Sequence, residues 1–421
     1  MDKLVITGGK KLSGEVRVSG SKNAALPIMA ATLLTDAPCT LLGVPRLRDT
    51  LTMMKLLESL GKKVSYEKGK LTVLANGPLK DTARYDLVST MRGSFCVLGP
   101  LLAKLRRAKV SLPGGCVIGI RPVDLHIKGL KALGASMQVD QGYIVATAKK
   151  LKGKQIYLGG VFGSSVLATA NIMMAATLAQ GETIIESAAC EPEVEDLGNF
   201  LVRMGAQIIG HGTSRIIIRG VEKLGGADHA IIPDRIEAGT FILLAVATRS
   251  DLVIRGAYHG HLLALLDVLQ TVGVRFKLTD DAIRVINKKT IAPASVNTYP
   301  YPGFPTDLQA QFMALMAITP GVSVITDRVY PDRFIHIAEL DRMGANIRRE
   351  GLMAIVQGVK TLYGAPVMAS DLRASAALVI AALTAQGKTE IHRIYHLERG
   401  YEDLEEKLKK IGADIKREKA S

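Results

Sequence analysis

The chain has no tryptophan, and aromatic residues make up only 5% of its 421 positions. Proteins that bind nucleic acids usually stack bases on aromatic side chains or present a basic recognition helix. In this chain the lysines and arginines are scattered along the whole sequence. The composition therefore disfavours a nucleic-acid-binding protein, which is kept as a minor alternative.

Cysteine is also scarce, with four residues and no pair at CxxC spacing. This argues against a zinc site and favours a reducing compartment. The pair His259 and His261 lacks a neighbouring carboxylate or cysteine, so we predict no metal site there. No run of 18 apolar residues occurs, the first residues lack the apolar stretch of a signal peptide, and no GxxxxGK[ST] loop for ATP is found. We expect a cytoplasmic protein without membrane insertion.

Positive charge is what the chain has in excess. Lysine and arginine total 54 against 39 aspartates and glutamates, a net charge of +15. Such an excess attracts anions, and with nucleic acid disfavoured it indicates a small polyanionic substrate. The length and the 48% hydrophobic content predict two folded domains.

A repeat of about seventy residues organises the sequence. Six segments follow the pattern of a leucine, three residues and a glycine, and the closing glycines are 73, 71, 68, 71 and 68 residues apart. Each glycine follows a helix-like pattern and precedes a strand-like one, so it is expected in a left-handed helix cap. The six glycines are Gly61, Gly134, Gly205, Gly273, Gly344 and Gly412.

Each repeat also contains an earlier segment that is apolar or small on nearly every side, which predicts a buried helix. The second helix of each repeat carries charge on one face and is expected outside it, while alternating runs such as 14–18 and 388–392 predict half-buried strands. The fold class is therefore α/β, with two domains as inside-out α/β barrels of six repeated units, helices buried and sheets outside. The predicted buried helices are 24–34, 93–102, 166–179, 238–247, 308–318 and 374–385.

Polar residues stand directly before these buried helices. We interpret four of them, Ser21, Ser89, Thr306 and Ser370, as helix caps. Lys22, Arg92 and Arg373 do not fit that interpretation, because a cation near a helix N-terminus opposes the helix dipole unless an anion binds there. These positions are candidates for an anion site.

The segment 112–126 combines a thiol, glycines and an arginine. Cys116 follows two glycines and precedes Arg121 by five residues, so backbone approaches a ligand closely and a nearby cation favours the thiolate. The spacing alone leaves a working thiol and an incidental loop cysteine as equal alternatives.

Five segments carry a resemblance to a known family: 20–25, 116–126, 304–307, 371–375 and 394–402. In these motifs, and over essentially its whole length, the chain resembles the UDP-N-acetylglucosamine enolpyruvyl transferases of the EPSP synthase superfamily. The resemblance implies one domain at 22–230 and a second at 1–21 plus 231–421, each of three units. It implies the 1-carboxyvinyltransferase activity that begins peptidoglycan synthesis: the enolpyruvyl group of phosphoenolpyruvate moves to the 3-hydroxyl of UDP-N-acetylglucosamine, and phosphate is released. It implies no cofactor and no metal.

The resemblance also assigns roles to residues. Cys116 is the implied proton donor to phosphoenolpyruvate, with which it also forms an adduct, and Asp307 is the implied base for the sugar hydroxyl. Lys22 and Arg399 complete the implied catalytic set. The implied phosphoenolpyruvate residues are Lys22, Asn23, Arg121, Arg333, Arg373 and Arg399. The implied sugar-nucleotide residues are Asn23, Arg92, Arg121, Pro122, Val123, Asp124, Leu125, Ser165, Val166, Asp307 and Val329.

The chain departs from the family pattern at Leu167, where glycine is usual, and at Gly163, where a bulkier or basic residue is common. Both changes fall in the loop expected to hold the uridine end of the sugar nucleotide. Three alternatives stay open: a shikimate-pathway enolpyruvyl transferase, a catalytically silent paralogue that binds the sugar nucleotide, and a basic protein that binds nucleic acid.

Overall fold

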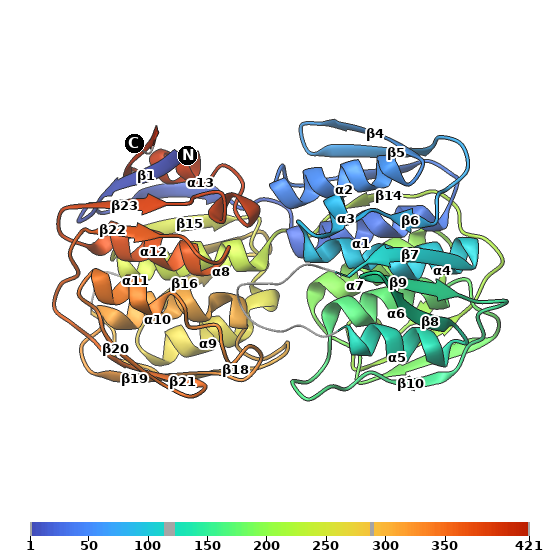
Figure 1. Cartoon of the computed structure of the whole chain (residues 1–421). Coiled ribbons are helices and arrows are strands. Elements are labelled where there is room, and N and C mark those ends of the chain that lie inside the picture. The colour runs from blue at the N-terminus through green and yellow to red at the C-terminus, as the bar shows by residue number, and fades with distance from the viewer. Residues whose placement is uncertain (1, 113–122, 287–289, 420–421) are drawn as a thin grey trace. The chain divides into compact units, whose positions relative to one another are not determined.

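The computed structural model describes residues 2–112, 123–286 and 290–419 (Figure 1). These residues form two compact units. The first unit contains residues 20–112 and 123–232, and the second contains 2–19 and 233–419 without the gap at 287–289. The chain therefore passes from one unit into the other near residue 20 and again near residue 232.

Each unit carries three four-stranded sheets with one shared topology. In every sheet an edge strand pairs in parallel with its neighbour, and the next two strands follow antiparallel. The sheets of the first unit run β14 (Asp228–Ala230), β3 (Cys39–Leu42), β5 (Lys70–Ala75), β4 (Lys62–Glu67); β6 (Thr82–Ala83), β7 (Arg107–Ser111), β9 (Tyr143–Thr147), β8 (Ser136–Asp140); and β10 (Gln155–Tyr157), β11 (Glu182–Glu186), β13 (Arg215–Arg219), β12 (Gln207–Ile209).

The second unit repeats this order, and one of its sheets contains the first strand of the chain. Its β1 pairs antiparallel with β23 and β24, with Leu4 opposite Ile391 and Ile6 opposite Ile415. The sheets run β2 (Ser13–Arg17), β15 (Asp251–Arg255), β17 (Ala282–Ile286), β16 (Arg275–Leu278); β18 (Val296–Thr298), β19 (Val322–Asp327), β21 (Met353–Gln357), β20 (Asn346–Glu350); and β22 (Pro366–Met368), β23 (Lys388–His392), β1 (Asp2–Thr7), β24 (Asp414–Lys419).

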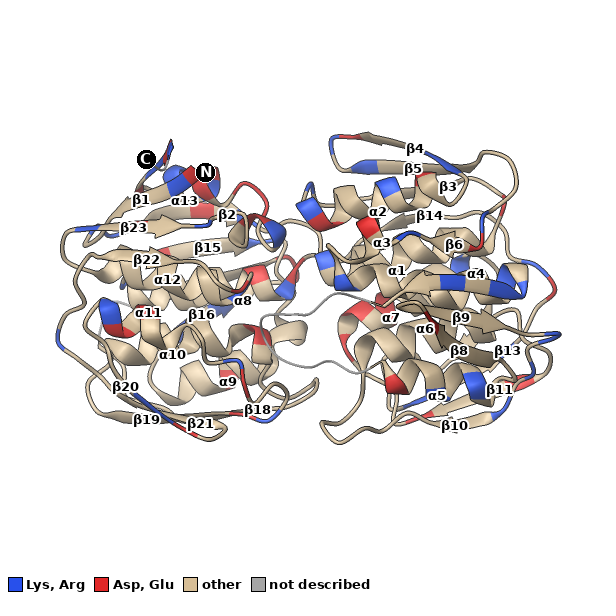
Figure 2. Ribbon diagram, viewed as in Figure 1, with Lys and Arg blue, Asp and Glu red and all other residues tan. Residues whose placement is uncertain are grey.

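The inner helices of each unit are almost free of charge. Helices α6, α10 and α12 contain no charged residue, and every residue of α10 is buried. Figure 2 shows lysine and arginine spread instead over the outer strands, loops and helix ends. The inner helices are α1 (Lys22–Ala31) with η1 (Thr32–Leu34), η2 (Arg92–Val97) with α4 (Leu98–Leu105), α6 (Val166–Ala176), α8 (Arg235–Ala247), η4 (Thr306–Leu308) with α10 (Gln309–Ala317), and α12 (Ala374–Thr384).

The second helix of each repeat buries only one side. These second helices are α2 (Arg48–Ser59), α5 (Asp124–Ala132), α7 (Pro192–Arg203), α9 (Leu263–Thr271), α11 (Ile337–Arg342) and α13 (Leu404–Lys410). Three short helices lie in connections: α3 (Tyr85–Val88), η3 (His259–Leu262) and η5 (Leu397–Arg399). The inside-out α/β architecture of six repeated units is confirmed. The six closing glycines have φ between +89° and +102°, which confirms their predicted left-handed conformation.

The capping prediction is right for Ser21 and wrong for three residues. Ser21 accepts a hydrogen bond from the Ala24 amide at 3.3 Å. Ser89 instead follows α3 at its C-terminal end, and the Thr306 hydroxyl donates to a carboxylate instead of capping. Ahead of α12 it is Asp371, not Ser370, that accepts from the backbone, because its carboxylate reaches two amides at once.

Among the residues that the structure describes, no helix is both long enough and apolar enough to cross a membrane.

Candidate active site

An arginine joins two carboxylates in the second unit. Arg333 Nη1 donates to Asp307 Oδ1 at 2.6 Å, and its Nη2 donates to Asp371 Oδ1 at 3.2 Å. Asp307 lies in η4, at the entry to the inner helix α10, and Asp371 lies just before α12. One guanidinium thus fixes the polar ends of two buried helices.

A third carboxylate, Asp327, supports this arrangement from the end of β19. Asp327 accepts the hydroxyl of Thr306 at 2.7 Å and the amides of Val329 and Tyr330 at 3.0 and 2.8 Å. The Thr306 oxygen in turn accepts from Arg333 Nη1 at 3.3 Å. The backbone at Val329, a predicted sugar-nucleotide residue, is therefore tied to the residues around Asp307.

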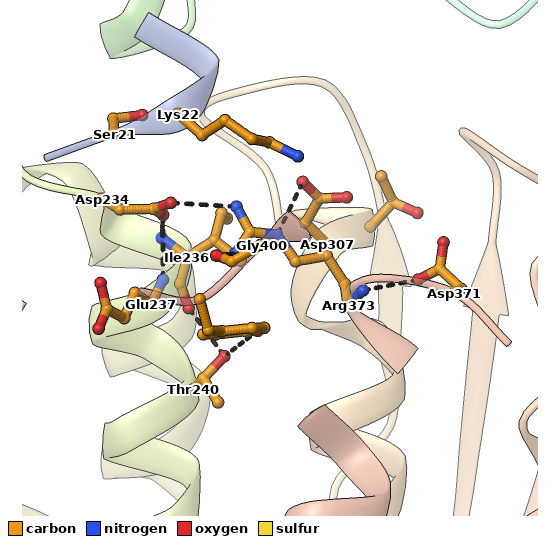
Figure 3. A network of polar contacts seen from close by, with 12 residues as sticks. Ser21, Lys22, Asp234, Ile236, Glu237, Thr240, Asp307, Asp371, Arg373 and Gly400 are labelled. Atoms are coloured by element: carbon orange, nitrogen blue, oxygen red, sulfur yellow. Dashed lines mark hydrogen bonds and ion pairs between the residues drawn. The ribbon is translucent and has the colours of Figure 1, made fainter. Parts of the chain in front are cut away.

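Arg373 forms the other half of the cluster (Figure 3). Its Nη2 donates to Asp234 Oδ2 at 3.1 Å, its Nη1 donates to the Gly400 carbonyl at 3.1 Å, and its Nε lies 3.8 Å from Asp307 Oδ2. Asp234 also caps α8 by accepting from the amides of Ile236 and Glu237. Because Gly400 follows Arg399 directly, the predicted residue Arg399 stands in the chain beside the carbonyl that Arg373 binds.

The arginines and carboxylates of this cluster each stabilise the charged form of the other. Burial alone would lower the pKa of both arginines, but the carboxylates of Asp371 and Asp307 raise that of Arg333, and Asp234 raises that of Arg373. Burial opposes ionisation of Asp371, but the positive charge of Arg333 and the hydrogen bonds from the amides of Ala374 and Arg373 together lower the pKa of that carboxyl. Both arginines and Asp371 are therefore charged at neutral pH.

Exposure distinguishes the members of the cluster. The Arg333 and Arg373 side chains are 4% and 2% exposed, whereas Asp307 is 26% exposed. The buried Nε of Arg373 has no hydrogen-bond partner among the described residues. Asp307 is thus the accessible carboxylate, held beside an unused arginine donor, an arrangement suited to proton abstraction next to a bound anion.

Lys22 is a buried cation of the first unit. Its Nζ lies 3.2 Å from Asp49 Oδ2 of α2, and both side chains are 6% exposed. Asn23 follows it in α1. Arg92 begins η2, and its neighbour Gly93 packs so closely on α1 that an added Cβ would lie 2.7 Å from Leu26 Cδ1. The structure therefore places these three predicted residues on neighbouring elements.

The predicted uridine-end residues lie on α5 and α6. Val123 precedes α5, Asp124 and Leu125 begin it, and Ser165 caps α6 by accepting from the Ala168 amide, with Val166 as the first helical residue. Leu125 Cδ1 packs against Gly160, where a Cβ would lie 3.1 Å away, and Gly160 and Gly163 exchange backbone hydrogen bonds. The two helix starts are joined through this turn.

Three predicted residues, Cys116, Arg121 and Pro122, lie outside the described residues. Of the other cysteines, Cys39 and Cys96 are buried and Cys190 lies in a loop. Burial raises the pKa of the Cys96 thiol to about 12. In the described part of the chain, no group of three histidine, cysteine or acidic side chains is placed to hold a metal ion.

Comparisons with known proteins agree over the whole length. The family model described as EPSP synthase (3-phosphoshikimate 1-carboxyvinyltransferase) matches residues 6–408. The chain belongs to the EPSP synthase family. A relative from Akkermansia muciniphila named UDP-N-acetylglucosamine 1-carboxyvinyltransferase is 52% identical over 420 residues, 99% of each chain. A relative of the same name from Koribacter versatilis is 52% identical over 421 residues, 99% of this chain and 96% of its own.

A solved structure of an EPSP synthase-family fold is also similar. The enolpyruvyl transferase NikO from Streptomyces tendae has a TM-score of 0.90 and 27% sequence identity, and the match covers 100% of this chain and 99% of the other. The family resemblance predicted from the sequence is confirmed.

Sequence reasoning missed several residues of this EPSP synthase-family site. Asp234 and Asp371 stood among the polar residues before the buried helices, but only their position, not their pairing with arginine, was visible. Thr240 and Gln311 carried one usable signal, because each is a polar residue inside a mainly apolar helix. Asp49 and Asp327 gave no such signal.

Proposed function

We propose that this chain transfers the enolpyruvyl group of phosphoenolpyruvate to the 3-hydroxyl of UDP-N-acetylglucosamine and releases phosphate, a reaction that begins peptidoglycan synthesis. The observation that carries the proposal is the cluster of the second unit, in which the accessible Asp307 is held by Arg333 next to the unused Nε donor of Arg373. Relatives of 52% identity that carry the name of this activity support it.

The first step is an addition. Cys116 donates a proton to the methylene carbon of phosphoenolpyruvate, so that C2 gains cationic character. Asp307 accepts the proton of the sugar hydroxyl while the oxygen of that hydroxyl forms a bond to C2. The product of this step is a tetrahedral intermediate that carries both the sugar oxygen and the phosphate on C2.

The second step is an elimination. The bond between C2 and the phosphate oxygen breaks, a proton from the new methyl group returns to the Cys116 thiolate, and the vinyl group forms again on the sugar. Arg333 and Arg373 are proposed to hold the carboxylate, and Lys22, Arg121 and Arg399 the phosphate, since arginine forks match both anions.

The residues proposed to contact the sugar nucleotide are Arg92, Asn23 and those at the starts of α5 and α6, together with Asp307 and Val329. We also propose that the protein works in the cytoplasm, where a reactive thiol such as Cys116 stays reduced.

The test is phosphate release from phosphoenolpyruvate with either UDP-N-acetylglucosamine or shikimate 3-phosphate as acceptor. We expect release with the sugar nucleotide only, and a loss of release in Cys116→Ala. Release with shikimate 3-phosphate would assign the other enolpyruvyl transfer, and release with neither acceptor would indicate a binding protein. Salt-sensitive affinity for DNA or RNA without phosphate release would favour a nucleic-acid-binding role.

A further inference from the structure

Tyr401 is a buried polar residue to which the proposed reaction gives no part. It is 2% exposed, and its ring lies under the Arg373 guanidinium, 5.1 Å from Cζ to the ring centroid. Its hydroxyl lies 2.8 Å from Thr240 Oγ1 of α8. The ring of Tyr401 therefore contacts Arg373, a residue proposed to bind the substrate, and its hydroxyl contacts the inner helix α8.

The direction of these hydrogen bonds follows from the donors present. The single hydroxyl hydrogen of Thr240 is directed at the Ile236 carbonyl, 2.9 Å away, so Tyr401 is the donor toward Thr240. The oxygen of Tyr401 then accepts from Gln311 Nε2 at 3.2 Å. Figure 3 shows Thr240 on its helix below Arg373.

Gln311 connects this group to the proposed base. Its Nε2 also donates to the backbone carbonyl of Asp307 at 2.9 Å, one helical turn earlier. A continuous path thus runs from the Arg373 guanidinium through the Tyr401 ring and hydroxyl to Gln311 and then to Asp307. All of its members belong to the second unit.

We propose that Tyr401 is a positioning residue that fixes the plane of the Arg373 guanidinium relative to Asp307. The inference rests on the proposed function, since it assumes that Arg373 binds the substrate carboxylate and Asp307 the sugar hydroxyl. The ring restricts the guanidinium by a desolvated cation–π contact. The hydroxyl restricts the ring by bonds to two inner helices, α8 and α10.

A direct acid–base role for Tyr401 does not fit its surroundings. Burial raises the pKa of its hydroxyl, although the charge of Arg373 opposes the effect, and the oxygen already has partners on both sides. A purely space-filling role does not fit either, because phenylalanine would fill the same volume without a hydroxyl that needs partners. The contacts leave orientation of Arg373 as the role of this side chain.

The test compares Tyr401→Phe, which keeps the ring, with Tyr401→Leu, which removes it. For Tyr401→Phe we expect a rise in KM for phosphoenolpyruvate of roughly threefold to tenfold, the effect of one hydrogen bond, with KM for the sugar nucleotide unchanged. Tyr401→Leu should lose roughly a further tenfold in kcat/KM because the cation–π contact disappears. Thr240→Val removes the acceptor, and combined with Tyr401→Phe it should add less than about twofold.

The control is Phe200→Leu in the core of the first unit, which lowers stability without contacting Arg373. If the Tyr401 variants shift the two KM values equally, or change activity only in proportion to melting temperature as the control does, the positioning role is wrong and the proposed function stands. If the wild type does not turn over, the proposed function is wrong. Calorimetric binding of phosphoenolpyruvate then decides the Tyr401 role: unchanged affinity in Tyr401→Phe overturns it, and weakened affinity supports it.

Discussion

Two buried arginines flank the carboxylate of Asp307. Arg333 Nη1 lies 2.6 Å from Asp307 Oδ1, and Arg373 Nε lies 3.8 Å from Asp307 Oδ2. The carboxylate is thus fixed in direction while its side chain stays 26% exposed. An aspartate held in this way suits the abstraction of a proton from a hydroxyl.

The first prediction concerns this carboxylate. Asp307→Asn keeps the size of the side chain and removes its capacity to accept a proton, so kcat for phosphate release should fall by about 10² to 10⁴. Folding should be retained, because an amide oxygen still accepts from Arg333. The measurement is steady-state phosphate release under saturating substrates, together with the melting temperature.

Asp332→Asn is the matched control for this substitution. It lies one residue before Arg333, its side chain is 76% exposed, and it pairs with Arg349 on the surface. Wild-type turnover is expected. A similar loss in both variants would mean that a general change in charge around Arg333, and not proton transfer at Asp307, limits the reaction.

The second prediction concerns Cys116. Burial raises the pKa of the thiols of Cys39, Cys96 and Cys190, which keeps them as unreactive thiols. The epoxide fosfomycin should therefore modify Cys116 alone, and faster when the sugar nucleotide is present. Peptide mass analysis measures the modification.

Variants separate the two roles given to this thiol. Cys116→Asp should escape modification and still release phosphate, because a carboxylic acid also donates a proton, whereas Cys116→Ala should escape modification and release no phosphate. An unmodified Cys116 peptide in the wild type, or an adduct on Cys190, contradicts the assignment.

Much of the fold follows from local sequence, and much of the site does not. The apolar helices and the closing glycines are local signals, so the sequence around Gly205 and Gly412 was enough to predict their left-handed conformation. The pairing of Arg373 with Asp234 joins residues 139 positions apart, and that of Tyr401 with Thr240 joins residues 161 apart. Such pairs form only when segments far apart in the sequence pack together, so no local sequence pattern predicts them.

The same reason explains the caps. Capping preferences rank serine with aspartate, so the sequence did not distinguish Ser370 from Asp371. The structure distinguishes them because the Asp371 carboxylate also binds Arg333, a residue 38 positions away. Family resemblance, by contrast, identified Asp307, Arg333 and Arg373 together before any geometry was known.

The third prediction is a loss of stability in mild acid. Burial lowers the pKa of His126 to about 3 and that of His336 to about 4. Because the folded-state pKa values lie below the unfolded value, the stability is complete above about pH 6.5 and is lost as the pH falls toward the folded values. Each histidine should cost about 2 kcal/mol of unfolding free energy between pH 7.5 and pH 5.

His336→Leu tests this expectation directly. Neither ring nitrogen of His336 has a hydrogen-bond partner among the described residues, so the substitution removes no described hydrogen bond. Urea unfolding at pH 7.5 and pH 5 should show a smaller acid loss in the variant than in the wild type. An unchanged pH dependence would show that carboxylates, not this histidine, govern the acid limb.

The last prediction concerns the segment where the chain leaves the second unit. Glu237 is 1% exposed, and its Oε2 accepts from the Ser19 amide at 2.9 Å. Lys407 of α13 donates to the other oxygen of Glu237 and to the Ser19 hydroxyl. This buried pair therefore fixes Ser19, three residues before Lys22.

Lys407→Met should destabilise the protein by about 3 kcal/mol, because it leaves the Glu237 carboxylate buried and without its partner. Burial raises the pKa of Glu237 and the charge of Lys407 opposes this, so without the lysine the folded-state pKa rises further. An acid with a raised folded-state pKa loses stability as the pH rises, so the loss should be larger at pH 8 than at pH 5. Lys409→Met changes a lysine of the same helix whose side chain is 42% exposed, so it should change the unfolding free energy little at either pH. Equal losses in the two variants would mean that the lysine side chains stabilise α13 by packing, and that the charge of Lys407 next to Glu237 contributes nothing.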